Sequence, residues 1–318
     1  MLEHLKVLDE IRLNFSQSSL MVLNITLALI MFGVALEIKI EHFKKLFKAP
    51  KSAFVGIFSQ FIALPAITFL VVILMKEYIT PTVAMGMILI AACPGGNISN
   101  FISSLAKGNV ALSVSLTAFA TITSIFMTPL NFAFWGGLYT KHLSRVDATS
   151  LLQPLEIPLG QVFQTVFILL GIPLILGMLF NWKFPKTTMR IVKTVKTISI
   201  VTFAAIVILA FMNNYEYFAT NIKYIFILVL LHNVVALSTG YSIASFFLLN
   251  NFDKRSITIE TGIQNSGLGL VLLFNPKIFP PELAIGGMAF IAAWWGIWHI
   301  LAGLGIAGVW SKIPMKNK

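Results

Sequence analysis

Long apolar runs recur along the whole chain, and they restrict its fold more than any other feature. A run of about 20 residues can cross the hydrocarbon core of a bilayer as a helix, whereas a membrane barrel shows short segments of alternating polarity. Hydrophobic residues make up 57% of the 318 residues, and charged residues only 11%. A soluble core cannot hide this much apolar sequence. We therefore expect an all-α membrane protein.

Nine apolar ranges are expected to be transmembrane helices. They are 19–37, 52–75, 81–106, 109–137, 158–182, 197–213, 221–249, 256–275 and 283–310. Before them, residues 1–18 mix charges with regularly spaced Leu and Ile. This pattern is closer to an interfacial amphipathic helix than to a cleavable signal. Cys93 is the only cysteine, so we expect neither an internal disulfide nor a cysteine-based metal cluster.

The basic residues between these ranges predict an orientation. Of the 23 Lys and Arg residues, sixteen fall on one side of a nine-helix arrangement and seven on the other. Because basic loops stay in the cytoplasm, the N-terminus is expected outside and the C-terminus inside the cell membrane. The same loops account for the net charge of +11, so no nucleic-acid partner is expected. We expect a monomer.

Two of the nine ranges are interrupted by residues that form helices poorly. One contains CPGGNISN at 93–100, and the other contains ETGIQNSGLG at 260–269. Gly and Pro are unfavourable within helices, and each segment also carries amide and hydroxyl side chains. The two ranges lie five spans apart and so cross in opposite directions. This pattern predicts an inverted repeat, residues 19–137 with four helices and 158–310 with five, with its site where the two discontinuous helices cross.

Glu260 lies within the second interruption and is the one carboxylate expected inside the membrane. A charge at the middle of a spanning helix costs roughly 2.5–3.5 kcal/mol on insertion scales, and no Lys or Arg shares this span. A bound cation is the favoured way to neutralise Glu260. Burial could instead keep it protonated, or it could be hydrogen-bonded to His232 or His299. Asp253, the nearest other acid, belongs to a basic loop and is expected to be solvated.

Oxygen-bearing side chains that suit sodium accompany Glu260 in the pattern. Gln264 follows it by four residues and shares its helical face, and Ser99 and Asn100 follow the other break. The range 109–137 adds a hydroxyl stripe at helical spacing, formed by Ser113, Thr117, Thr121, Ser124 and Thr128. For its last three members, hydrogen bonding between helices is the favoured interpretation.

The chain resembles the bile acid:sodium symporter family in two regions. One is CPGGNISN followed by KGNVALSVSLT, and the other is ETGIQNSG followed by FPPE. The resemblance covers about residues 20–310. It implies a core domain, residues 52–137 and 221–310, packed against a panel domain, residues 19–37 and 158–213. Many bacterial members have ten helices, so this chain departs from them by lacking the first.

The resemblance also implies two sodium ions and their ligands. The first ion is expected to be held by Ser99, Asn100, Ser113, Thr117 and Glu260. The second is expected to be held by the side chains of Gln60, Glu260 and Gln264 and the carbonyls of Thr261 and Ile263. Substrate is expected between core and panel, beside the crossing.

Asn97 and Asn265 are the side chains expected to face that substrate. Each stands at its break without being required as an ion ligand. The half-helix N-termini favour an anionic group there. His299, with Trp294, Trp295 and Trp298, could add an aromatic wall, although ordinary packing is the favoured interpretation of these rings.

The preferred function is sodium-coupled import of an organic anion by alternating access. The alternative is a cation/proton antiporter with Glu260 as the carrier, although such sites usually pair two carboxylates. An enzyme is not expected, because no second acid or nucleophile–base pair accompanies Glu260. The pattern does not choose between a bile salt and a smaller acid such as pantoate or pyruvate.

Overall fold

The computed structural model describes residues 1–10, 17–146, 159–212, 215–275, 278–280 and 283–314. Over these residues every element is a helix, and the one β-type pairing is an isolated bridge between Gly95 and Gln264. The expected all-α class is confirmed.

The first half contains seven α-helices after its N-terminal turns, counted over the described residues. They are α2 (Gln17–Ala35), α3 (Ile40–Lys48), α4 (Pro50–Phe58), α5 (Leu64–Leu74), α6 (Pro81–Ala92), α7 (Ile98–Leu105) and the long α8 (Val110–Val146). A π-helical turn joins α4 to α5. That turn, η2 (Ser59–Ala63), precedes Pro65. Proline has no N–H to donate and clashes with the carbonyl four residues earlier, which explains the widened turn around Gln60.

The second half begins after the undescribed residues 147–158. Its helices are α9 (Leu159–Val166), the π-helical turn η3 (Phe167–Gly171), α10 (Ile172–Lys183), α11 (Pro185–Met212), α12 (Tyr215–Phe246), α13 (Asn251–Gly262), α14 (Ser266–Leu273) and α15 (Gly286–Lys312). Pro173 follows η3 as Pro65 follows η2, and the same steric cause applies.

Helices cover most of each expected transmembrane range, although α11 begins twelve residues before the range 197–213. Within the described residues, four helices are long and apolar enough to cross a membrane by length and composition: Pro50–Leu74, Val110–Leu143, Ala219–Phe246 and Gly286–Lys312. The interrupted pairs α6–α7 and α13–α14 consist of a 12-residue and an 8-residue helix each, too short to cross singly. The count of nine spans stays a prediction.

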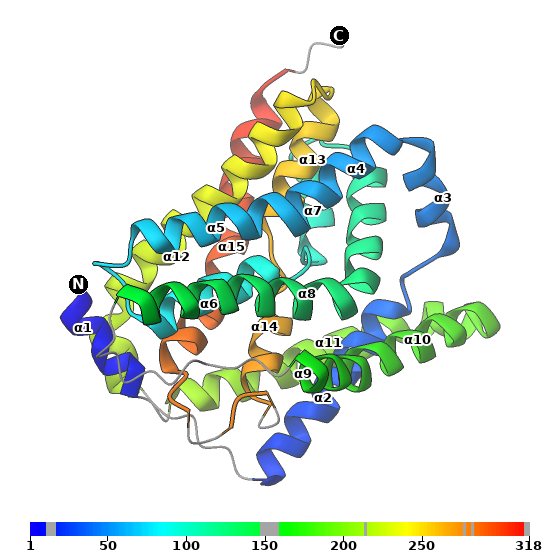
Figure 1. Cartoon of the computed structure of the whole chain (residues 1–318). Coiled ribbons are helices and arrows are strands. Elements are labelled where there is room, and N and C mark those ends of the chain that lie inside the picture. The colour runs from blue at the N-terminus through cyan, green and yellow to red at the C-terminus, as the bar shows by residue number, and fades with distance from the viewer. Residues whose placement is uncertain (11–16, 147–158, 213–214, 276–277, 281–282, 315–318) are drawn as a thin grey trace.

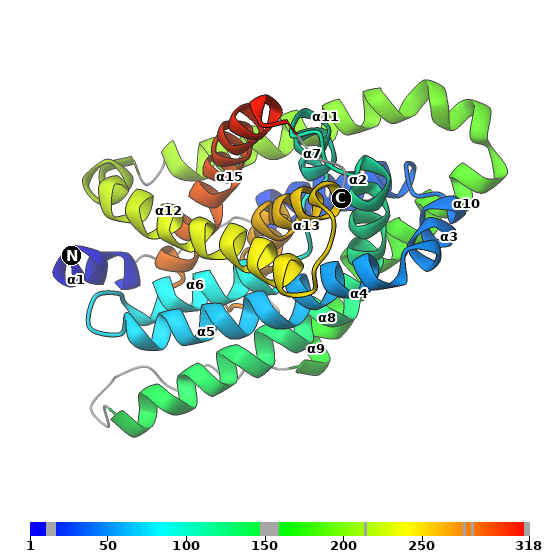
Figure 2. The same ribbon diagram turned by 90° about the horizontal axis from the view of Figure 1, so that it is seen from above.

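The helices gather in two groups (Figures 1 and 2). Helix α2 packs on α10 and α11, while α12 packs on α13 and α15 packs on α6 and α14. Helix α8 contacts both α6 and α9, and α14 contacts α2, so these helices join the groups. The crossing helices belong to the second group, and the division into a core and a panel domain stays a prediction.

The N-terminal residues pack against the protein. Helix α1 (Leu2–Lys6) and the 3-10 turn η1 (Val7–Glu10) bury Leu5 and Leu8 completely. Asp9 accepts hydrogen bonds from Thr80 Oγ1 at 2.7 Å and from Thr82 Oγ1. Burial raises the pKa of the Asp9 carboxyl above its ordinary value. The apolar side of this segment is therefore covered by helices; residues 11–16 of the expected amphipathic helix lie outside the described residues.

The expectation of a solvated Asp253 was wrong. Its side chain is 6% exposed and lies in the first turn of α13. The carboxylate accepts from Ser52 Oγ at 2.6 Å, Asn109 Nδ2 at 2.7 Å and Asn250 Nδ2 at 3.1 Å. These neutral donors and the helix N-terminus stabilise a carboxylate at this position. Asp253 thus ties α13 to the starts of α4 and α8.

Candidate ion and substrate site

The two helix breaks lie against each other. Asn265 N donates to Pro94 O at 2.8 Å, and Gly96 N donates to Ile263 O at 2.6 Å, so the unwound segments form a short antiparallel pair. These bonds satisfy backbone groups that the breaks release from helical pairing. A Cβ added at Gly95 would strike Glu260 Oε1, and only glycine allows this approach. The crossing therefore places the first break directly on Glu260.

Glu260 is 2% exposed and is surrounded by hydroxyl groups. Its Oε2 accepts from Ser99 Oγ at 2.5 Å, and its Oε1 accepts from Thr117 Oγ1 at 2.8 Å. Ser113 Oγ lies 3.4 Å from Oε2. None of the salt bridges of the described residues involves Glu260. The carboxylate is therefore held by neutral donors from α7 and α8.

The two histidines do not provide the hydrogen bond to Glu260 that the sequence left open. His232 Nε2 pairs with Thr68 Oγ1 at 2.9 Å. His299 is hydrogen-bonded to the backbone of Gln264.

Asn100 completes the first expected ligand set. Its Oδ1 accepts from Ser113 Oγ at 2.9 Å and from Thr117 Oγ1 at 3.1 Å. Thus all five residues expected around the first ion belong to one hydrogen-bonded cluster. One carboxylate with neutral hydroxyl and amide oxygens is a donor set suited to a hard cation.

The second expected set is brought together in part. Gln60 Nε2 donates to Gln264 Oε1 at 2.8 Å, and Gln264 Nε2 donates to Thr261 O at 2.6 Å. The Ile263 carbonyl accepts the bond from Gly96 across the crossing. The described hydrogen bonds of the Glu260 side chain all go to the first set. The two glutamines face each other next to the Glu260 cluster rather than sharing its bonds.

The end of the hydroxyl stripe on α8 does not link helices. Thr121 Oγ1 donates to Thr117 O at 2.7 Å, and Ser124 Oγ donates to Thr121 O at 2.8 Å. Hydroxyls within a helix can bond to carbonyls of the preceding turn, which explains the difference from the expected interhelical bonds. Ser113 and Thr117 remain the members that reach another helix through their side chains.

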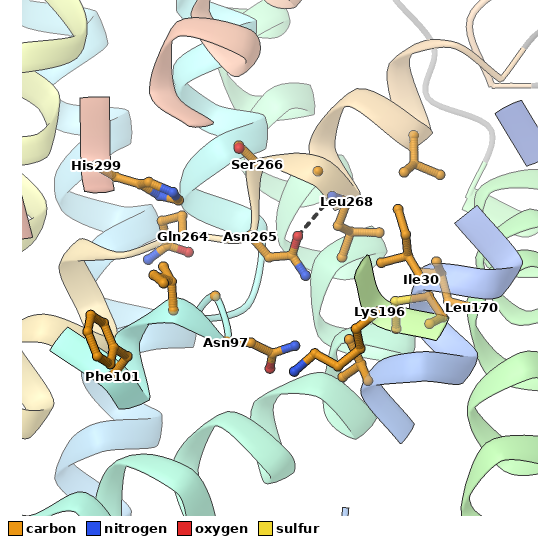
Figure 3. Close-up of a pocket in the computed structure, with 16 residues that line it drawn as sticks. Ile30, Asn97, Phe101, Leu170, Lys196, Gln264, Asn265, Ser266, Leu268 and His299 are labelled. Carbon is orange, nitrogen blue, oxygen red and sulfur yellow. Dashed lines mark hydrogen bonds between the residues drawn. The ribbon is translucent and has the colours of Figure 1, made fainter. Parts of the chain in front are cut away.

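A pocket of about 510 Å³ lies beside the crossing (Figure 3). Its lining combines the two breaks and α15 with α2, η3 and α11, and it includes Asn97, Asn265 and His299. Asn265 Oδ1 accepts from Leu268 N at 3.1 Å and caps α14, the bond drawn dashed in Figure 3. Asn97 stands at the N-cap of α7 without a side-chain capping bond. The three residues expected at the substrate therefore share one pocket.

The three tryptophans take no part in the pocket lining. Trp295 packs edge-on against His232, with ring centroids 4.8 Å apart, and Trp294 and Trp298 pack against Phe226. Packing, the favoured interpretation, describes these rings, and only His299 lines the pocket.

Lys196 also lines the pocket, and the sequence analysis missed it. The sequence places Lys196 in the loop before the range expected to begin at 197, among the sixteen basic residues expected on the cytoplasmic side. Helix α11 begins at Pro185 instead, so Lys196 lies within it. Its position one residue before an apolar run was the signal available in the sequence.

Comparison with known proteins places these features in a family. The model of the sodium bile acid symporter family matches residues 24–221. The chain belongs to this family. It is 30% identical over 296 residues to an uncharacterized sodium-dependent transporter, YocS, of Bacillus subtilis, covering 93% of this chain and 85% of that protein.

Two eukaryotic relatives show the range of names in the family. A probable chloroplastic sodium/metabolite cotransporter of rice, BASS2, is 30% identical, with 84% of this chain and 62% of that protein covered. Human sodium/bile acid cotransporter 4 is 29% identical, with 82% of this chain and 57% of that protein covered. The family is one of sodium-dependent membrane transporters, which agrees with the expectation that the chain is not an enzyme.

Proposed function

We propose that the chain is a sodium-coupled symporter that imports an organic anion by alternating access. The observation that carries this proposal is the position of Glu260. Its buried carboxylate and its hydroxyl partners lie at the crossing, and the residues of the same crossing line the pocket. Ion binding and substrate binding would therefore depend on the same backbone segments.

Two sodium ions would use the two oxygen clusters. The first ion would replace the hydroxyl hydrogen bonds of Glu260 by direct contacts with Ser99, Asn100, Ser113 and Thr117. The second would separate Gln60 from Gln264 and take their oxygens together with the Thr261 and Ile263 carbonyls and Glu260. Each ion would supply the positive charge that a carboxylate at this depth needs.

The anion would bind where the two short helices begin. Helices α7 and α14 have their N-termini at Asn97 and Asn265, and both residues line the pocket. The partial positive charge of the two helix ends favours an anionic group. The Asn265 amide nitrogen can donate to that group, because the capping bond uses its Oδ1.

The proposed topology has nine spans, with the N-terminus outside and the C-terminus in the cytoplasm. Movement of the α2, α10 and α11 group against the crossing helices would open the pocket to one side at a time. Two sodium ions entering with one monoanion carry one net positive charge inward. The membrane potential then adds about 2.3 kcal/mol per 100 mV to the sodium gradient.

A cation/proton antiporter remains the different transport function to exclude. It would need Glu260 to exchange a proton for the ion and would need no organic anion. The family relationship does not favour it, and Glu260 is surrounded by hydroxyls rather than by a second carboxylate.

Glu260→Gln tests the proposal, with Glu77→Gln as the matched control because Glu77 is an exposed carboxyl outside both clusters. The melting temperature of purified wild-type protein should be higher in sodium chloride than in choline chloride. Proteoliposomes should take up labelled cholate or pantoate only when an inwardly directed sodium gradient is applied. Glu260→Gln should lose both responses, and Glu77→Gln should keep them. A wild-type sodium response in Glu260→Gln would refute the proposal that Glu260 is a ligand of both ions.

A further inference from the structure

Lys196 is the one cationic side chain in the lining of the pocket as the described residues define it. That lining contains no carboxylate; its polar members besides Lys196 are amides, Ser266 and His299. In Figure 3 the Lys196 side chain extends from the α11 side of the pocket toward Asn97. The pocket thus offers a full positive charge opposite the two helix breaks.

The ammonium group is held by a neighbour just outside the pocket lining. Lys196 Nζ and Glu37 Oε2 form an ion pair of 2.7 Å, with side chains 28% and 50% exposed. The lysine stem lies against α2, where a Cβ added at Gly33 would come within 3.3 Å of Lys196 Cγ. The stem therefore lies close to the backbone of α2, and the same side chain both pairs with Glu37 and lines the pocket.

We propose that Lys196 binds the carboxylate of the transported anion and exchanges Glu37 for it, which makes the pocket selective for monoanions with an apolar body. This inference rests on the proposed function and deepens it. A partly exposed ion pair is weak enough to be replaced by a second carboxylate. The pocket supplies the second carboxylate with donors that Glu37 does not have, the amides of Asn97 and Asn265.

The rest of the lining fixes the other properties of the substrate. Ile30, Met31 and Val34 of α2, with Leu170 and Val271, form an apolar surface beside the charged end. One cationic side chain balances one negative charge, and a second carboxylate would be left among apolar groups. Glu37 would reclaim Lys196 when the anion leaves, so that the unloaded pocket is not left with an unpaired charge.

The test compares cholate and pantoate with their uncharged counterparts, methyl cholate and pantolactone, by calorimetric titration in sodium chloride. Lys196→Met should weaken binding of whichever acid binds by at least about ten-fold, because a charge-assisted hydrogen bond is lost. Lys193→Met, an exposed lysine on the same helix, should leave binding unchanged. Glu37→Gln should tighten binding a few-fold, because the competing carboxylate is gone.

A charge-swapped double variant separates substrate binding from a merely structural ion pair. Glu37→Lys with Lys196→Glu restores the pair but places a carboxylate at the pocket, so the acid should no longer bind while the sodium-dependent rise in melting temperature remains. Restored acid binding in the swap, or wild-type acid binding in Lys196→Met, would overturn the inference alone. If none of the four compounds binds the wild-type protein in sodium, the proposed function and this inference both fail.

Discussion

At the scale of single residues, the proposed ion ligands and the proposed anion donors are different side chains of the crossing. Thr117 Oγ1 contacts both carboxylate oxygens of Glu260, at 2.8 and 3.0 Å, and Asn100 Oδ1 at 3.1 Å. Asn265 instead faces the pocket and caps α14. Gln264 and Asn265 lie in the unwound segment between α13 and α14, so Gln264 does not share a helical face with Glu260 as expected. The Gln264 side chain is hydrogen-bonded to Gln60 and to Thr261 O, whereas Asn265 caps α14. Different residues of the crossing should therefore serve the ion and the anion.

Thr117→Val and Asn265→Ala should have opposite effects. Thr117→Val removes a proposed ion ligand, so the sodium concentration for half-maximal stabilisation should rise about ten-fold while anion binding at saturating sodium is spared. Asn265→Ala should weaken anion binding and, through the lost cap, lower stability by about 1 kcal/mol, yet keep the sodium response. Melting curves against sodium concentration, with and without anion, measure both effects.

Thr123→Val is the control for Thr117→Val, because the Thr123 hydroxyl bonds to the Phe119 carbonyl of its own helix at 2.9 Å. Some cross-talk is expected, since ion and anion affinities are linked reciprocally. Loss of the sodium response in Asn265→Ala, with its retention in Thr117→Val, would reverse the assignment.

Two residues, Asp253 and Lys196, could not be placed correctly from the sequence, because their surroundings depend on which neighbours their side chains point toward. Asp253 reads as part of a basic loop, and nothing local shows that Ser52 and Asn109 will donate to it from 201 and 144 residues away. Lys196 reads as a loop charge, and only the packing of α11 on α2 turns it toward the pocket. Glu260, in contrast, was predictable because a charge within an apolar run has few explanations.

At the scale of elements, the two breaks were predictable and their contacts were not. Gly and Pro at 94–96 and Gly262 indicated unwound segments at two places. Periodicity cannot show that Gly96 bonds to Ile263, or that Pro65 widens the turn that carries Gln60. By itself Gln60 reads as an ordinary interhelical amide, and the family resemblance alone assigned it to the site.

Gly95→Ala tests whether the close approach of the breaks matters for ion binding. The added methyl would strike Glu260 Oε1, so the carboxylate must move away from Ser99 and Thr117. We expect at least a ten-fold loss of sodium affinity together with a lower melting temperature. Sodium titration of the melting temperature measures the first, and the sodium-free melting temperature measures the second.

Gly137→Ala is the matched control, because an added Cβ there meets no atom within 4 Å and α8 is helical at that position. Alanine is favoured over glycine in a helix, so this variant should melt no lower than the wild type. Wild-type sodium affinity in Gly95→Ala would mean that the approach of Gly95 to Glu260 is incidental to ion binding.

At the scale of the whole molecule, helix lengths agree with a membrane-crossing arrangement. The continuous helix Pro50–Leu74 has 25 residues, which at about 1.5 Å per residue exceeds a hydrocarbon core of about 30 Å. The interrupted pairs reach this length only together. Their equal pattern of 12 and 8 residues, in opposite halves of the chain, is what an inverted repeat would produce.

The distribution of basic residues along the whole chain predicts its orientation in the membrane. If the side with sixteen basic residues is cytoplasmic, a fluorescent reporter that folds only in the cytoplasm should give signal when fused after Lys318 or after Lys48. Fusion after Lys76, past one more expected span, should give none. Immunoblotting of each fusion controls for expression.

The three fusion points also test the number of spans. Lys48 and Lys76 are separated by one helix, Pro50–Leu74, so their signals must differ if that helix crosses the membrane. Lys48 and Lys318 are separated by eight expected spans, and an even number returns the chain to the same side. A dark fusion at Lys318 with a bright one at Lys48 would require an odd number of spans between them, and the nine-span topology would be wrong. Signal at Lys76 alone would invert the orientation, and Lys196 would then lie toward the outer side of the pocket.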